Sequence, residues 1–146
     1  MTSLCIFASG FINSKPLFED SVKKFMEMIK YRSNVNHVMY SGNMNGLVGT
    51  IFEESIKHNI KVTLKNQFDD CDLYIALPGG IGTIYQIVKV IYYYKPILIY
   101  NIDGFYDNFI NYLNEIQTLE MVDQNLYKNI KIVSSLQDVE EWLKIV

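Results

Sequence analysis

The stretch with the clearest chemical potential is an apolar run followed by a glycine-rich turn. Residues 72–77 are mostly apolar, and Gly79, Gly80 and Gly82 follow them after a proline. Such a run is typical of a strand buried on both faces. The glycines remove side chains where the backbone must turn tightly or let a ligand approach. We expect Thr83 to cap the helix that follows this turn.

A strand, a turn and a helix start place free backbone N–H groups and the positive end of a helix dipole around one point. Such a point binds anions, and phosphate above all. We therefore expect a phosphate group at this turn, with the Thr83 hydroxyl as a further donor. The expected phosphate-binding residues are Gly79, Gly80, Ile81, Gly82 and Thr83. A tight connection that binds no ligand is the alternative interpretation. The pattern is not a Walker P-loop, because no Lys-Ser/Thr pair follows the glycines.

Other turns of small or polar residues follow other apolar runs. Ser9 and Gly10 follow the first run, Gly42 and Gly46 follow the second, and Asp103 follows the run at 97–100. In open α/β sheets the carboxyl ends of the strands share one edge, where ligands bind. We expect the ribose and base of a nucleotide to extend there toward Ser9 and Asp103. A turn-forming role is the alternative for Asp103.

The order of apolar patterns predicts the fold class. Short apolar runs alternate with segments of helical spacing, one of which begins at Pro16 and another at Ser135 with Asp138 in a capping box. The predicted strands are 4–8, 37–41, 60–64, 72–77, 97–100 and 130–133. This alternation predicts an α/β fold, a Rossmann-like parallel sheet of about six strands with helices on both faces. We expect residues 1–146 to form a single nucleotide-binding domain.

Composition narrows the function classes. The net charge of −3 disfavours sequence-independent nucleic-acid binding, which needs a basic face. Cys5 and Cys71 are too few, and too deep in predicted strands, for a disulfide framework, which indicates a reducing compartment. No membrane span or signal peptide is visible, so we expect a cytoplasmic protein. We see no metal-ligand set and expect no cofactor, and we interpret Glu53 and Glu54 as a solvated helix face.

The helix expected after the glycine turn is unusually apolar. Its predicted stripe consists of Ile84, Ile87, Val88, Ile91 and Tyr92, and further apolar or aromatic residues lie outside that stripe. A helix that is apolar on so much of its circumference needs more cover than one sheet face supplies. We expect a homodimer in which this helix faces its copy, with burial by its own chain as the alternative.

The glycine turn resembles the P-G-G-x-G-T-x-x-E signature of the LONELY GUY (LOG) family, long mislabelled as lysine decarboxylases. Residues 78–83 match this pattern, and Gln86 stands at the final glutamate position. Residues 42–49 resemble the family's G-G-G-x-x-G-L-M-G segment, and residues 101–106 resemble N-x-D-G-Y-Y. The resemblance covers nearly the whole chain except a shortened middle segment. There the family's Arg-Lys pair falls on Thr63 and Leu64, and Lys65 is the nearby cation.

The resemblance implies binding of a nucleoside 5'-monophosphate and hydrolysis of its N-glycosidic bond to free base and ribose 5-phosphate. It also implies a homodimer. In the family the motif glutamate and the arginine carry the reaction, and this chain lacks both. Gln86 and Asp103 are therefore the candidates for catalysis, and Lys65 joins the nucleotide-binding candidates. A non-catalytic nucleotide sensor or sink of the same superfamily is the alternative, and a single-stranded DNA-binding relative is disfavoured by the acidic charge.

Overall fold

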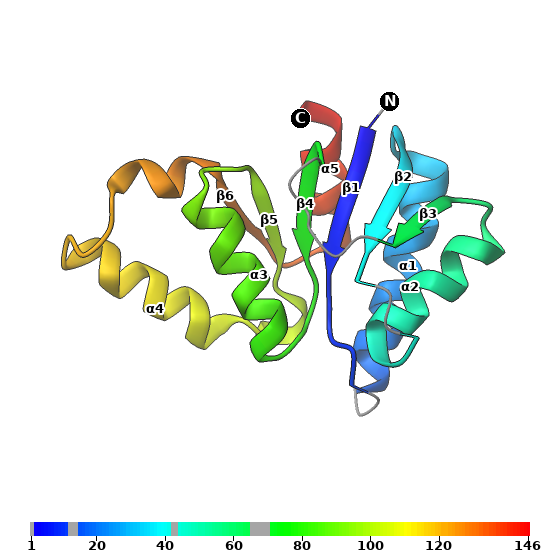
Figure 1. Ribbon diagram of the computed structural model, residues 1–146, viewed down its shortest axis with the longest axis horizontal. Coiled ribbons are helices and arrows are strands. Elements are labelled where there is room, and N and C mark those ends of the chain that lie inside the picture. The colour runs from blue at the N-terminus through cyan, green and yellow to red at the C-terminus, as the bar shows by residue number, and fades with distance from the viewer. Residues whose placement is uncertain (1, 12–14, 42–43, 65–70) are drawn as a thin grey trace.

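The computed structural model describes residues 2–11, 15–41, 44–64 and 71–146. Its core is a six-stranded sheet in which every strand pair is parallel (Figure 1). The strands are β1 (Thr2–Phe7), β2 (Val35–Tyr40), β3 (Lys61–Leu64), β4 (Leu73–Ala76), β5 (Ile97–Tyr100) and β6 (Ile130–Val133). Their order in the sheet is β3-β2-β1-β4-β5-β6. The predicted Rossmann-like parallel sheet is confirmed.

Helices connect the strands and cover both faces of the sheet. They are α1 (Pro16–Arg32), α2 (Gly46–Lys57), α3 (Ile81–Tyr92), α4 (Asp107–Thr118) and α5 (Leu136–Ile145), with short 3₁₀ helices η1 (Ile102–Gly104) and η2 (Gln124–Asn129). Pro16 occupies a first helical position, and the Ser135 side chain accepts a hydrogen bond from the Asp138 N–H. Both predicted helix starts are therefore confirmed.

The alternation of side chains along each strand divides the core in two. On β1, Leu4 and Ile6 belong to the cluster that packs against α1, α2 and α5. Cys5 and Phe7 belong to the cluster on the opposite face, which packs against α3 and α4. This is the pattern expected of a strand buried on both faces, because successive side chains point to opposite sides.

The chain reverses its direction of travel across the sheet between β1 and β4. From β1 the chain moves outward through β2 to β3, and from β4 it moves outward through β5 to β6. The two strands are direct neighbours, with Phe7 of β1 paired to Ala76 of β4. In open α/β sheets the carboxyl ends at such a switch point form the ligand-binding crevice. The fold therefore locates the site between the β1–α1 and β4–α3 loops.

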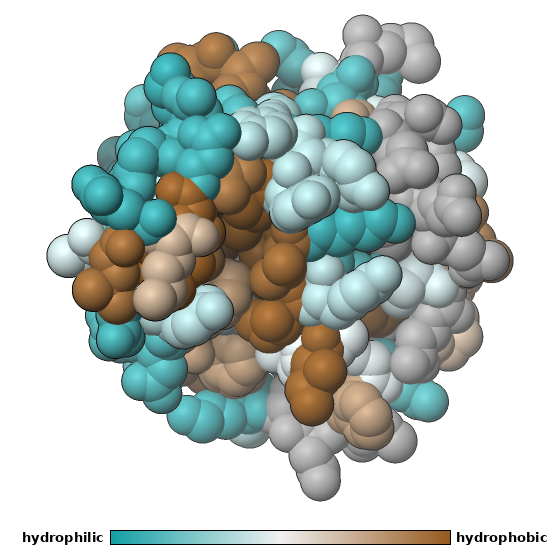
Figure 2. Space-filling model, turned by 60° about the vertical axis from the view of Figure 1, so that its left-hand side comes forward, coloured by the Kyte–Doolittle hydropathy of each residue, from teal (hydrophilic) through white to brown (hydrophobic). Residues whose placement is uncertain are grey.

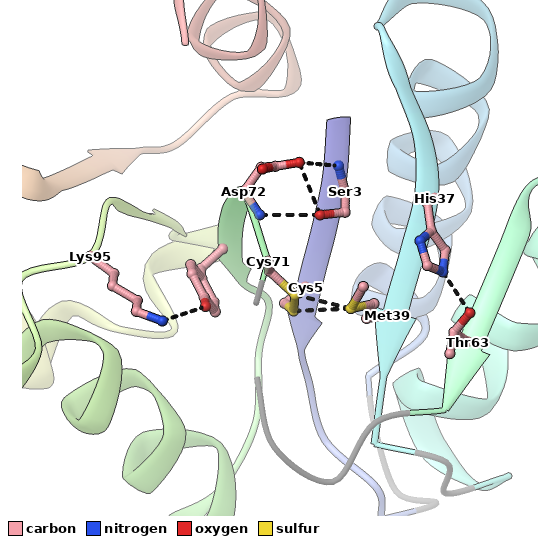
Figure 3. The surroundings of a disulfide bond; sticks show 9 residues. Ser3, Cys5, His37, Met39, Thr63, Cys71, Asp72 and Lys95 are labelled. Carbon is pink, nitrogen blue, oxygen red and sulfur yellow. Dashed lines mark hydrogen bonds between the residues drawn. A yellow bond between two sulfur atoms is a disulfide. The ribbon is translucent and has the colours of Figure 1, made fainter. Parts of the chain in front are cut away.

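The structure joins the two cysteines, which the sequence patterns did not predict. Cys5 on β1 and Cys71, just before β4, form a disulfide across 66 residues with their Cα atoms 6.0 Å apart (Figure 3). The physical reason is the pairing of the two strands, which brings the start of β4 alongside β1. The Met39 sulfur lies 3.2 Å from the Cys71 sulfur.

Two further expectations need correction. Glu54 is buried rather than solvated, because α2 turns it toward His58, whose Nε2 lies 3.8 Å from Glu54 Oε1. The apolar stripe predicted for α3 is also partly wrong, because Val88 and Tyr92 are exposed. The buried residues of this helix are Thr83, Ile87, Val90 and Ile91.

Among the described residues, no helix combines the length and the apolar character that crossing a bilayer requires.

Candidate functional site

The turn between β4 and α3 presents an open helix N-terminus. Gly80 occupies the N-cap position of α3, and no described side chain caps the helix. A Cβ atom built on Gly80 or on Gly82 would meet no described atom within 4 Å. The packing of the described residues therefore does not require glycine at these positions. The backbone N–H groups of the first helical turn are left beside open space.

Gly79 and Thr83 have a different relationship. A Cβ on Gly79 would lie 2.1 Å from the Thr83 Oγ1 atom, and Thr83 is only 5% exposed. The expectation that Thr83 caps α3 is wrong, because Gly80 occupies the cap and Thr83 is the third helical residue. Gly79 lets the turn close tightly over the Thr83 side chain, and the turn is compact for that reason.

A cavity of about 250 Å³ lies in front of this turn. We call it the turn pocket, and its lining residues are Ala8, Ser9, Gly10, Phe11, Ser41, Gly80, Ile81, Gly82, Thr83 and Gln86. It joins the end of β1 to the start of α3, as the strand order requires. The structure thus brings Ser9, Gly10 and Gln86 together with the expected phosphate turn. Gln86, one helical turn into α3, is partly buried.

The N-terminus of α2 is closed by the protein itself. The Val48 N–H donates a hydrogen bond to the Ser9 carbonyl oxygen at 3.1 Å. Gly46 has a φ of +64°, and a Cβ there would lie 2.4 Å from the Phe11 carbonyl oxygen. The close approach of the β1–α1 loop thus explains this glycine. The described lining of the turn pocket does not include Gly46. Gly42 and Lys65 lie outside the described residues.

A second cavity of about 280 Å³ adjoins the turn pocket. We call it the aromatic pocket, and its lining residues are Ser9, Phe11, Phe18, Leu47, Pro78, Gly79, Gly80 and Phe105. Phe18 and Phe105 meet edge to face with their ring centroids 5.5 Å apart. Three residues, Ser9, Phe11 and Gly80, line both pockets. Sequence reasoning missed Phe11 and Phe18, although Phe11 directly follows the Ser9-Gly10 turn.

Asp103 lies close to the aromatic pocket but outside the lining of either cavity. It lies on η1 in a left-handed conformation, with a φ of 53°. The carboxylate is exposed, and its Oδ2 atom lies 3.9 Å from the Lys15 Nζ atom. The structure therefore separates Asp103 from Gln86, the other candidate for catalysis, because Gln86 lines the turn pocket and Asp103 does not.

Buried hydrogen bonds fix the loop that carries Asp103. The Tyr106 N–H donates to the Asn101 Oδ1 atom at 2.7 Å, and the Asn101 amide donates to the Asp107 Oδ1 atom at 2.8 Å. The Tyr106 hydroxyl donates to the carbonyl oxygen of Leu77, directly before the glycine turn. Burial of Tyr106 raises the pKa of its hydroxyl well above the ordinary value. The hydroxyl therefore stays protonated, and its hydrogen bond connects the Asp103 loop to the β4–α3 turn.

Metal chemistry finds no support in the described part of the chain. No group of three or more His, Cys, Asp or Glu side chains there could hold a metal ion. The polar side chains in the lining of the turn pocket are instead Ser9, Ser41, Thr83 and Gln86, beside apolar Ala8, Phe11 and Ile81. These groups suit an uncharged or anionic polar ligand, and phosphate in particular.

Comparisons with known proteins identify the family of the chain. The family model described as "Possible lysine decarboxylase" matches residues 46–144. Cytokinin riboside 5'-monophosphate phosphoribohydrolase LOG2 of Arabidopsis thaliana is 25% identical over 77% of this chain and 68% of its own length. The enzyme LOG of Oryza sativa subsp. japonica is 41% identical, but over 30% of this chain and 20% of its own length. A third relative, named "Probable cytokinin riboside 5'-monophosphate phosphoribohydrolase LOGL3" and from the same plant, is 31% identical over 47% of this chain and 34% of its own length.

Solved structures show the same architecture. The molybdenum cofactor (Moco) carrier protein of Chlamydomonas reinhardtii superposes with a TM-score of 0.72 over 98% of this chain and 95% of its own, at 7% identity. The molybdenum cofactor binding protein of Rippkaea orientalis has a TM-score of 0.69 at 12% identity, over 98% and 95% of the two chains. At these identities the likeness establishes the fold alone.

Proposed function

The chain belongs to the LOG family, whose model is described as "Possible lysine decarboxylase", and from this premise we propose that it binds nucleoside 5'-monophosphates. The observation that carries the proposal is the open N-terminus of α3. Gly80 and Gly82 have free space where a side chain would be, and the turn pocket lies in front of them. A phosphate group there would accept hydrogen bonds from the backbone N–H groups of residues 80–83 and neutralise the helix dipole.

The remaining polar groups would position the sugar. With the phosphate at α3, the polar side chains of the turn pocket that remain for the ribose hydroxyl groups are Ser9, Ser41 and Gln86. Gly46 contributes indirectly, because it lets α2 close on the Ser9 carbonyl. Gly79 contributes through the tight turn over Thr83. These placements support a nucleotide site at the β1–β4 switch point, where open α/β sheets bind ligands.

The reaction proposed for this site is hydrolysis of the N-glycosidic bond, which is what the names of the curated relatives describe. Water adds its hydroxyl group to the sugar carbon C1', the C1'–N bond breaks, and the base leaves with a proton. Positive charge builds on the sugar, so a nearby carboxylate lowers the barrier. Gln86 can orient the water but has no negative charge, and general-base catalysis alone contributes about 10²–10⁴-fold. We therefore propose a slow enzyme in which Gln86 is the candidate catalytic side chain within the turn pocket. Asp103 remains the candidate carboxylate, although it lies outside the lining of this pocket.

A non-catalytic nucleotide sensor or sink is the second candidate. The observation that favours it is the amide of Gln86 in the turn pocket, because this pocket has no carboxylate in its described lining. Such a protein would keep the phosphate turn and bind the ligand without cleaving it.

We also propose that the protein acts as a homodimer that covers the outer face of α3. Figure 2 shows a band of hydrophobic side chains down the middle of the face on which α3 and α4 lie. The exposed apolar and aromatic residues of α3 are Ile81, Tyr85, Val88 and Tyr92, and Tyr93 and Tyr94 continue this patch beyond the helix end. A patch of this kind on a soluble domain marks an interface. Replacing Val88 and Tyr92 by lysine should convert the dimer to a monomer in sedimentation analysis.

The cytoplasmic location is also a proposal. The cytosol keeps thiols reduced, whereas Cys5 and Cys71 are bridged in the structure. Alkylation of free thiols in protein isolated under non-reducing conditions distinguishes the two states. Alkylation of both cysteines would support the cytoplasmic location. Alkylation of neither cysteine would indicate an oxidising compartment.

The test of function uses one set of samples for two measurements. Purified protein is incubated with a panel of nucleoside 5'-monophosphates that includes N6-substituted adenosine monophosphates. Binding is followed by calorimetry and free base by chromatography. Release of base that Gln86→Ala or Asp103→Asn reduces would support the enzyme. Tight binding without turnover would support the sensor or sink, and absence of both signals would contradict the proposed function.

A further inference from the structure

The turn that connects β4 to α3 is held by contacts from two separate parts of the chain. From the end of β1, the Phe7 carbonyl oxygen accepts a hydrogen bond from the Leu77 N–H at 2.8 Å. In the loop after β1, the Ser9 N–H donates to the Pro78 carbonyl oxygen at 2.9 Å. The Leu77 carbonyl oxygen has a side-chain partner instead, because it accepts from the hydroxyl of Tyr106.

The Tyr106 hydroxyl bridges the two sides of Pro78. It donates to the carbonyl oxygen of Leu77, and the backbone N–H of Gly79 interacts with the same hydroxyl group. Pro78 between them has no N–H to offer. Leu77 and Tyr106 are both buried, so solvent water does not take the place of the hydroxyl. One side chain therefore serves the backbone groups on both sides of the proline.

Tyr106 is itself held in a fixed position. Its N–H donates to the Asn101 Oδ1 atom at 2.7 Å, and the Asn101 amide donates to the Asp107 Oδ1 atom at 2.8 Å. The Tyr106 ring meets the rings of Phe105 and Phe109 edge to face, with centroid distances of 4.9 and 6.2 Å. Only 1% of Tyr106 is exposed. The hydroxyl is therefore presented by a side chain with little freedom to move.

The backbone that Tyr106 holds leads directly into the open N-terminus of α3. Gly79 precedes Gly80, the N-cap residue, and the first N–H groups of the helix follow. Hydrogen bonds from these groups to an anion depend on their direction, and they cost no rearrangement if that direction is already set. A site that is looser by about 1 Å loses much of this advantage. The contact with Tyr106 therefore bears on the strength of anion binding.

We propose that Tyr106 is a positioning residue of the phosphate site: its hydroxyl sets the conformation of residues 77–79 and, through them, the direction of the N–H groups that receive the phosphate. This inference rests on the proposed function. It adds a residue that acts without touching the ligand, because Tyr106 lines neither the turn pocket nor the aromatic pocket.

The test removes this hydroxyl and compares the variant with a matched control. Tyr106→Phe keeps the ring and loses the contacts on both sides of Pro78. The control is Tyr127→Phe, because the Tyr127 hydroxyl also donates to a backbone carbonyl oxygen, that of Leu113, and lines neither pocket. Each variant loses one hydrogen bond from a tyrosine to the backbone, so both should unfold at a lower temperature than the wild-type protein.

The readout that separates position from stability is ligand affinity. Adenosine 5'-monophosphate and ribose 5-phosphate are titrated by calorimetry into each protein, at a temperature where thermal unfolding shows all of them folded. Tyr106→Phe should bind both ligands about ten-fold more weakly, because the two ligands share the phosphate. Tyr127→Phe should bind both as tightly as the wild-type protein.

Several results would overturn the inference. Wild-type affinity in folded Tyr106→Phe would show that the phosphate site does not depend on this hydroxyl. Equal losses of affinity in Tyr106→Phe and Tyr127→Phe would make lowered stability the cause. A loss confined to adenosine 5'-monophosphate would mean that the hydroxyl affects another part of the ligand. If the wild-type protein binds neither ligand, the proposed function fails and this inference fails with it.

A second variant tests the same network if Tyr106→Phe does not fold. Asp107→Ala removes the acceptor of the Asn101 amide, and Asp107 is exposed, so the fold should persist. Loss of this contact loosens Asn101 and thereby Tyr106. We expect affinity for both ligands to fall about two- to three-fold, less than in Tyr106→Phe because the effect is indirect. Unchanged affinity in Asp107→Ala would then contradict the inference.

Discussion

Helices α2 and α3 start in similar positions in the fold, but the surroundings of their N-termini differ. Each follows a parallel strand and a glycine-containing turn at the same edge of the sheet. At α2 the Ser9 carbonyl accepts the Val48 N–H, and Gly46 is required because backbone oxygen atoms lie where its side chain would be. At α3 the positions of Gly80 and Gly82 face open space. The same sequence signal therefore serves packing in one turn and leaves open space in the other.

The largest expected effect comes from placing charge in the open turn. Gly82→Asp puts a carboxylate where the phosphate would bind, and we expect affinity for nucleoside 5'-monophosphates to fall at least a hundred-fold. The fold should persist, because the new side chain meets no described atom and an acidic residue suits the first helical turn. Calorimetry measures the affinity, and thermal unfolding checks the fold. Unchanged affinity would place the phosphate elsewhere.

The next effect concerns the closed turn. Gly46→Ala forces a side chain into a left-handed conformation and against the Phe11 carbonyl oxygen. We expect the free energy of unfolding to fall by at least about 2 kcal/mol. Urea denaturation measures the change. If this variant is as stable as the wild-type protein, packing does not require Gly46, and the contrast between the two turns disappears.

A smaller effect is expected from a substitution that should raise the stability of the protein and lower its affinity for nucleotides. Gly82→Ala replaces glycine within a helix and meets no steric conflict, so we expect stability to rise by about 0.5–1 kcal/mol. The added methyl group occupies space needed by the phosphate, so nucleotide affinity should fall. Urea denaturation measures the stability and calorimetry measures the nucleotide affinity, both on the same preparation. A more stable variant with full affinity would show that no ligand approaches this glycine.

The smallest effect is expected from a control substitution at the amino ends of β1 and β4, the end of these strands opposite to the candidate site. Hydrogen bonds from the Ser3 N–H and hydroxyl lower the pKa of the Asp72 carboxyl. A lowered folded-state pKa stabilises the fold above the ordinary pKa, and this contribution disappears as the pH falls through the folded-state value. Below about pH 4, the stability of Asp72→Asn should therefore fall slightly less with decreasing pH than that of the wild-type protein. Nucleotide affinity at neutral pH should not change, and a change would connect this edge to the site.

The sequence predicted the fold well because the strands are short apolar runs separated by clear turn residues. It also predicted the convergence of Ser9, Gly10 and the glycine turn, since parallel strands bring their carboxyl ends to one edge. It did not separate the open turn from the closed one, because that difference depends on whether atoms of the β1–α1 loop lie against each glycine.

Local patterns failed where the packing of the folded chain decides the outcome. Thr83 looked like a cap but packs under Gly79, and Glu54 looked solvated but lies beside His58. The disulfide depends on strand pairing across 66 residues. The aromatic pocket combines phenylalanines from three separate segments, and their spacing in the sequence gives no sign that they meet.

The most direct test of the central claim is a calorimetric titration of adenosine 5'-monophosphate into the wild-type protein and into Gly82→Asp at the same protein concentration. The open N-terminus of α3 predicts saturable binding to the wild-type protein and none to a folded variant. Equal binding by both proteins, or by neither, would contradict the assignment of this turn as the phosphate site.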